Sequence, residues 1–106
     1  MKKKKLYHKL VRDRVPEVLD SLGKEYSAYQ IRQDDLTRFA FKKLREEVQE
    51  FVENPCPEEM GDIREILDFI CERLSLSETS IQAAQISKRV KRGGFTMGIL
   101  LEWVED

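Results

Sequence analysis

Residues 42–74 read KKLREEVQEFVENPCPEEMGDIREILDFICERL, a pattern that predicts two acidic helices joined by a short turn. With about 3.6 residues per turn, the first helix has one apolar face, made of Leu44, Val48, Phe51 and Val52. The second helix has a matching face, made of Met60, Ile63, Ile66, Leu67, Ile70 and Leu74. Pro55 and Pro57 bracket the connection, and so short a turn predicts that the two helices lie antiparallel, side by side.

Four carboxylates lie at the borders of these apolar faces: Glu47, Glu50, Glu59 and Asp62. Charged groups at the rim of a core are costly unless a cation or dense hydrogen bonding compensates them. An antiparallel pair of helices brings both acid pairs to one seam, where oxygen-only ligands suit Mg²⁺ or Mn²⁺ better than zinc. The pattern therefore predicts a divalent metal site. The alternative is an exposed acidic helix face, which is the commoner meaning of an EExxE run.

Composition limits the class of protein. The chain has 106 residues, of which 37% are charged, but its net charge of −1 gives no overall field that favours nucleic acid or a membrane. Cys56 and Cys71 lack the spacing of a zinc site or a disulfide framework, so a reducing cytoplasm is expected. No apolar run is long enough for a membrane span. We expect one domain over residues 1–106, with residues 1–5 forming a flexible basic tail.

The fold class expected for the whole chain is mainly α, with short extended segments near the N-terminus. Pro16 marks the first turn of a helix that ends at Gly23. Residues 26–31 (YSAYQI) combine aromatic and β-branched side chains, which predicts a short strand or extended segment. Asp34 or Asp35 is then expected to cap the long helix that leads into the acidic stretch.

The C-terminal third is expected to contain one more helix, capped by Ser77 or Ser80 and ending in the basic segment 87–95 (SKRVKRGGF). Cations at a helix C-terminus complement its dipole, so a structural explanation is available. Its two glycines also free the backbone to approach a ligand, and its cations could hold phosphate oxygens beside a metal. The apolar tail, residues 99–104, is expected to pack on the domain or on a partner chain.

Two arginines near the N-terminus have no single interpretation, whereas the neighbouring histidine has one. Arg12 and Arg14 either form surface ion pairs, or approach an anion or support the acidic site from outside. His8 is the only histidine, and it has no nucleophilic partner at a recognisable spacing, so we interpret it as structural.

The acidic motif is familiar in its spacing. Glu46-Glu47-x-x-Glu50 followed by Glu59-x-x-Asp62 resembles the EExxE…ExxD signature of the all-α nucleoside triphosphate pyrophosphohydrolases. That superfamily includes the MazG-like enzymes, the dimeric dUTPases and phosphoribosyl-ATP pyrophosphohydrolase. Residues 9–17 (KLVRDRVPE) and 88–95 (KRVKRGGF) look like a subgroup of small, single-domain, house-cleaning MazG-like proteins, so the resemblance covers nearly the whole chain.

The resemblance implies an antiparallel helical bundle that hydrolyses a nucleoside triphosphate between the α and β phosphates, giving a monophosphate and pyrophosphate. It implies Mg²⁺ as the cofactor, with Mn²⁺ as a substitute, and the metal ligands would be Glu47, Glu50, Glu59 and Asp62. Glu46 would be the base that orients the attacking water, or an acid that supports the ligands. Candidate phosphate contacts are Lys43, Lys88, Lys91 and Arg92. The family's assembly implies a homodimer or homotetramer.

Two other functions are compatible with the sequence. A helical adaptor or regulatory protein would keep the fold without the chemistry, and its acids would pair with cations of the same chain, namely Arg12, Arg14, Lys88 or Lys91. A nucleic-acid-binding module would rest on residues 2–5 and 88–92 and would bind in a strongly salt-dependent way. The near-neutral net charge disfavours the nucleic-acid module.

Overall fold

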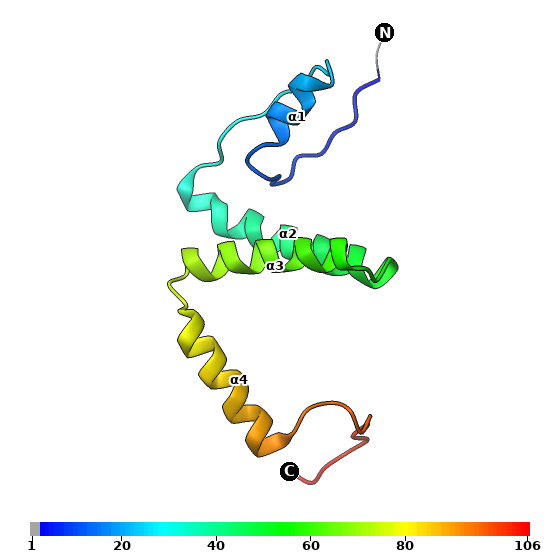
Figure 1. Ribbon diagram of the computed structural model, residues 1–106, viewed down its shortest axis with the longest axis vertical. Helices are drawn as coiled ribbons and strands as arrows, with labels where there is room; N and C mark the ends of the chain where they lie inside the picture. Colours follow the sequence, from blue (N-terminus) through cyan, green and yellow to red (C-terminus); the bar gives the residue numbers. More distant parts are fainter. Residues whose placement is uncertain (1–2) are drawn as a thin grey trace. The chain divides into compact units, whose positions relative to one another are not determined.

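Four α-helices make up the regular structure of residues 3–106, the part of the chain that the computed structural model describes (Figure 1). They are α1 (Val15–Ser21), α2 (Gln33–Glu53), α3 (Pro57–Arg73) and α4 (Glu78–Arg92). No β-strand occurs in this range, so the mainly α prediction is confirmed. None of the described helices combines the length and the apolar character needed to cross a bilayer. The chain divides into two compact units, Met1–Leu74 and Ser75–Asp106, and each is described by itself.

The first unit is built on an antiparallel hairpin of α2 and α3, as the short turn predicted (Figure 1). Residues 54–56 form the connection. At the opposite end of the hairpin, Arg73 Nε donates to Thr37 Oγ1 at 2.7 Å and Arg73 Nη1 donates to Gln33 Oε1 at 2.9 Å. The last turn of α3 is therefore fastened to the first turn of α2.

The core of this unit lies where α3 meets α2. Ala40 is completely buried, so α3 can approach α2 closely. Val48 and Val52 were expected on the buried face of α2, but they are 43% and 65% exposed, and that prediction is wrong. The buried face is centred on Ala40, Leu44 and Glu47, and a step of about 100° per residue carries both valines round toward solvent. The core residues are Ala40, Ile66 and Ile70, with Leu10, Phe41, Leu44 and Phe69 packed against them.

Neither helix of the hairpin begins with a side-chain cap. α2 starts at Gln33, directly after Arg32, so the prediction that Asp34 or Asp35 caps this helix is wrong. Both aspartates lie in the first turn instead, where their charge complements the positive end of the helix dipole. α3 starts at Pro57, which needs no acceptor for a backbone N–H.

The chain before the hairpin is mostly irregular. Pro16 lies in the first turn of α1, and Gly23 follows its end with a φ of 68°, as predicted. Residues 26–31, predicted to form a short strand or an extended segment, form neither a strand nor a helix, and the described chain offers no second strand to complete a hydrogen-bonded ladder. Of the predicted basic tail, residues 3–5 are exposed and irregular, and residues 1–2 lie outside the described part of the chain.

The second unit contains α4 and the segment that follows it. Ser77 caps α4, since its Oγ accepts a hydrogen bond from the Ser80 N–H at 3.1 Å, which confirms one of the two predicted caps. The last turn of α4 is basic, yet no residue of this helix is buried. The large apolar side chains of residues 99–104 are 73% to 86% exposed. The apolar tail therefore does not pack within its own unit.

Candidate metal centre

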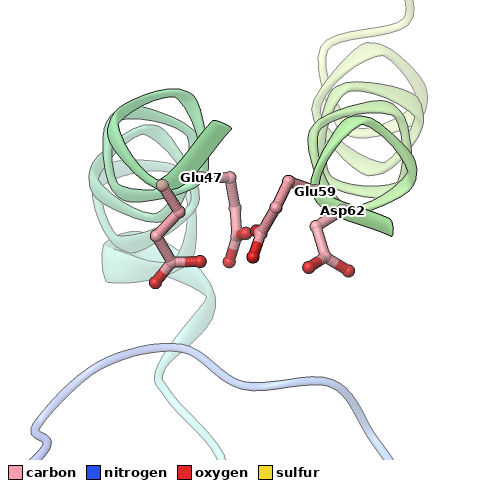
Figure 2. Close-up of side chains that lie close together, drawn as sticks. Glu47, Glu59 and Asp62 are labelled. Carbon is pink, nitrogen blue, oxygen red and sulfur yellow. The ribbon is translucent and has the colours of Figure 1, made fainter. Parts of the chain in front are cut away.

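Four carboxylates from α2 and α3 converge near the turn that joins the two helices. Glu47 and Glu50 come from α2, and Glu59 and Asp62 come from α3. One oxygen atom from each lies within 4.8 Å of the chosen oxygens of the other three. Figure 2 shows Glu47, Glu59 and Asp62 pointing into one shared space. The structure thus brings together the four acids that the sequence singled out, and we call them the acidic cluster.

Two oxygens of the acidic cluster are buried without a hydrogen-bond partner among the described residues. They are Oε2 of Glu47 and Oε2 of Glu59. Glu47 is only 6% exposed, so it is not part of a solvated acidic surface. A buried carboxylate oxygen without a partner is costly. A cation bound between the helices would supply the missing partner for both oxygens.

The protonation of Glu50 reflects the same crowding. Burial raises the pKa of the Glu50 carboxyl above its ordinary value, and the neighbouring carboxylate of Glu47 raises it further. The charges of Glu46 and Glu59 act in the same direction. A raised pKa of this kind is expected where several carboxylates lie close together with too few positive charges nearby.

Two cations of the described chain form ion pairs with the acidic cluster. Lys43 Nζ lies 3.1 Å from Glu47 Oε1, and Arg12 Nη2 lies 2.7 Å from Asp62 Oδ1. Two positive charges therefore face four carboxylates, so the cluster keeps a net negative charge that one divalent cation would balance. An all-oxygen donor set of this kind fits Mg²⁺ or Mn²⁺.

Glu46 adjoins the acidic cluster, but it bonds to lysines. Its carboxylate lies 2.7 Å from Lys9 Nζ and 3.4 Å from Lys43 Nζ. Partial burial alone would raise the pKa of Glu46, but the hydrogen bond from Lys9 and the charge of Lys43 outweigh burial and hold that pKa below its ordinary value. The same hydrogen bond raises the pKa of Lys9. Glu46 thus remains ionised near neutral pH and positions two cations beside the cluster.

The N-terminal segment, residues 9–12, spans the open side of the acidic cluster. In Figure 2 the blue N-terminal chain runs past the carboxylates on the side away from the helices. Lys9 ties the segment to α2 through Glu46, and Arg12 ties it to α3 through Asp62. No role was predicted for Lys9 from the sequence. The sequence offered one signal for this role. The cations Lys9 and Arg12 lie on either side of the apolar residues 10–11, and Leu10 packs against the core.

The two N-terminal arginines differ in role. Arg12 supports the acidic site, which was one of the two interpretations left open by the sequence. Arg14 forms a surface ion pair with Glu17 at 2.7 Å, which was the other interpretation. His8 stacks edge-on against Phe39, with ring centroids 6.0 Å apart, in keeping with its structural interpretation.

Three of the expected phosphate contacts lie in the second unit. Lys88, Lys91 and Arg92 are on the C-terminal turns of α4. Lys88 and Arg92 line a cavity of about 620 Å³, whose remaining lining residues are Gln85, Arg89, Gly93, Gly94 and Phe95. Lys91 does not line this cavity. Lys43 is the one member of the expected set that belongs to the same unit as the acidic cluster.

Comparisons of the chain with protein-family models, with curated proteins and with solved structures found no match. The resemblance to the MazG-like pyrophosphohydrolases therefore rests on the sequence motifs alone.

Proposed function

We propose that this protein is a Mg²⁺-dependent nucleoside triphosphate pyrophosphohydrolase that releases pyrophosphate and a nucleoside monophosphate. Its metal ligands would be Glu47, Glu50, Glu59 and Asp62, and Mn²⁺ would serve as an alternative metal. The single observation that carries the proposal is the pair of buried carboxylate oxygens, on Glu47 and Glu59, that have no partner and belong to one cluster. The EExxE…ExxD resemblance supports this reaction and a house-cleaning role toward non-standard nucleotides.

The residues around the acidic cluster suit this chemistry. A bound Mg²⁺ supplies a Lewis acid that offsets the negative charge of the phosphoryl oxygens. Lys43 holds Glu47 in position, and Lys9 and Arg12 border the open side, where a polyphosphate would approach. Glu46 orients Lys9 and Lys43. Its lowered pKa makes it a weak proton acceptor, which favours a supporting role for Glu46 over that of the base.

We also propose that the protein forms a homodimer or homotetramer. The exposed apolar side chains of residues 99–104 support this proposal, because contiguous apolar surface of this kind usually marks an interaction site. Sedimentation of the purified protein tests it, and a monomer at all concentrations would contradict it.

The function is tested with Glu47→Gln, which keeps the shape of the side chain but removes its charge. We expect pyrophosphate release to fall by at least about a hundredfold, because a buried metal ligand is lost. A panel of nucleotides with Mg²⁺ should be assayed for pyrophosphate separately from phosphate, and circular dichroism should show unchanged helicity. Glu53→Gln is the matched control, since Glu53 is exposed on the same helix outside the cluster. Near-full activity of Glu47→Gln would refute the ligand assignment.

The second candidate is a helical adaptor without catalytic activity. The ion pairs of Arg12 with Asp62 and of Lys43 with Glu47 favour it, because internal pairing of the acids is what an adaptor requires. Calorimetric titration with Mg²⁺ separates the two functions. The enzyme binds the ion at the acidic cluster and Glu47→Gln weakens that binding, whereas the adaptor releases no heat of metal binding.

A further inference from the structure

Arg12 donates a hydrogen bond to one oxygen of Asp62, which is one of the four proposed metal ligands. Its Nη2 lies 2.7 Å from Asp62 Oδ1, and its Nη1 lies 3.8 Å from Glu65 Oε1. An oxygen that accepts a hydrogen bond from a guanidinium has less electron density to offer a metal ion. Arg12 and a metal therefore compete for Asp62.

The ion pair between Arg12 and Asp62 is exposed to solvent, so it can break at little cost in free energy. The two side chains are 56% and 40% exposed, and ion pairs with this much solvent around them contribute little to stability. Glu47, in contrast, is buried with Lys43 beside it. Of the two cations paired with the acidic cluster, Arg12 is thus the one that a metal displaces at lower cost.

We propose that Arg12 is an exchangeable counter-ion, which the metal displaces from Asp62 and which then binds a phosphate oxygen of the incoming ligand. The inference rests on the proposed metal centre. The N-terminal segment stays anchored after the exchange, because Lys9 is bonded to Glu46 and Leu10 packs against the core. The freed guanidinium therefore remains at the border of the cluster, and its planar fork matches the geometry of a phosphate.

This exchange couples the metal to the anion. Metal binding frees Arg12 for the phosphate, and a phosphate that engages Arg12 frees Asp62 for the metal. By thermodynamic linkage each ligand then strengthens the binding of the other by the same factor.

The first experiment works without metal. In EDTA, Asp62→Asn releases Arg12 from its carboxylate, and the full chain should bind inorganic tripolyphosphate roughly two- to fivefold more tightly than the wild type, as measured by calorimetry. Asp68→Asn is the matched control, because Asp68 is exposed on the same helix and its change alters the net charge equally. The double variant Asp62→Asn, Arg12→Gln should lose the gain. An equal gain in Asp68→Asn, or a gain that survives in the double variant, overturns the proposal.

The second experiment uses Mn²⁺ alone. Arg12→Gln removes the competitor for Asp62, so its Mn²⁺ affinity should rise roughly two- to fivefold, whereas Arg14→Gln, which loses a charge from the same region, should change little. An unchanged or weakened affinity in Arg12→Gln overturns the proposal. Failure of the wild type to bind Mn²⁺ at all would overturn the proposed metal centre. Failure of the tripolyphosphate gain, with Mn²⁺ binding intact, would overturn only the role of Arg12.

Discussion

The α2–α3 hairpin and the α4 segment are both helical, but different forces hold them. α2 and α3 lack side-chain caps, yet they bury Ala40, Ile66 and Ile70 between them. α4 has the Ser77 cap and a basic last turn, yet it buries nothing. Helices as short as α4 are marginal in water without tertiary packing. The hairpin is thus stabilised by burial and tolerates poor ends, whereas α4 depends on its ends.

The largest difference in stability between the two regions is expected from Ile70→Ala compared with Ile86→Ala. Ile70 is 6% exposed in the core, so its truncation should lower the free energy of unfolding by about 2 to 4 kcal/mol. Ile86 is 56% exposed on α4, and its truncation should change stability by less than about 0.5 kcal/mol. Urea denaturation of both variants measures the difference. Equal losses would show that α4 is packed in solution.

A smaller effect is expected from Ser77→Ala, which removes the acceptor for the Ser80 N–H. The cost should be about 1 kcal/mol, concentrated in α4. Amide hydrogen exchange followed by NMR should show faster exchange in the first turns of α4 and no change in α2.

Asp34→Ala is the counterpart in the hairpin. Asp34 makes no cap hydrogen bond, so the substitution removes its interaction with the helix dipole and an exposed ion pair with Arg32 at 3.8 Å, at about 0.3 to 0.5 kcal/mol in all. If amide hydrogen exchange along α2 accelerated in Asp34→Ala as much as exchange along α4 does in Ser77→Ala, then α2 would depend on its end as α4 does.

An effect as small as that of Asp34→Ala, but of opposite sign, is expected at the acidic cluster, where like charges lower the stability of the hairpin. Glu50→Gln removes like-charge repulsion and should stabilise the metal-free protein at neutral pH by roughly 0.5 kcal/mol. The pKa of Glu50 is raised in the folded state, so Glu50 contributes stability at low pH that is lost as the pH rises through its folded pKa. The gain from Glu50→Gln should therefore vanish as the pH falls through that pKa.

Thermal unfolding in EDTA over a range of pH measures this gain. Glu53→Gln is the control, because Glu53 is exposed and lies outside the acidic cluster. Added Mg²⁺ should stabilise the wild type more than Glu50→Gln. A Glu50→Gln variant that is less stable than the wild type at neutral pH would show that the repulsion is already neutralised.

Local sequence patterns were sufficient to predict much of the hairpin and the residues of the acidic cluster. The spacing of the acids and the bracketing prolines predicted the antiparallel pair and the meeting of Glu47 with Asp62. The same patterns could not determine the rotation of α2 about its axis. Ala40 packs against Ile66 and Ile70 of α3, and with this face of α2 turned inward Glu47 is buried and Val48 is exposed.

Contacts between residues distant in the sequence were also beyond prediction. Lys9 and Glu46 are 37 residues apart, and Arg12 and Asp62 are 50 residues apart. No periodicity links such positions, because the path of the N-terminal segment depends on where Leu10 packs. The cations nearest to the acidic cluster were therefore only partly anticipated, with Lys43 named in advance and Arg12 left with two interpretations.

The bonds from Arg73 to Thr37 and Gln33 have a consequence for ion selection. They close the hairpin at the end opposite residues 54–56, so they resist a lengthwise slide of one helix past the other. With that slide resisted, the distances across the acidic cluster adjust mainly through side-chain torsions. Mg²⁺ and Ca²⁺ carry the same charge but differ in ionic radius and coordination number. We expect an acidic cluster on helices held in this way to distinguish the two ions by size.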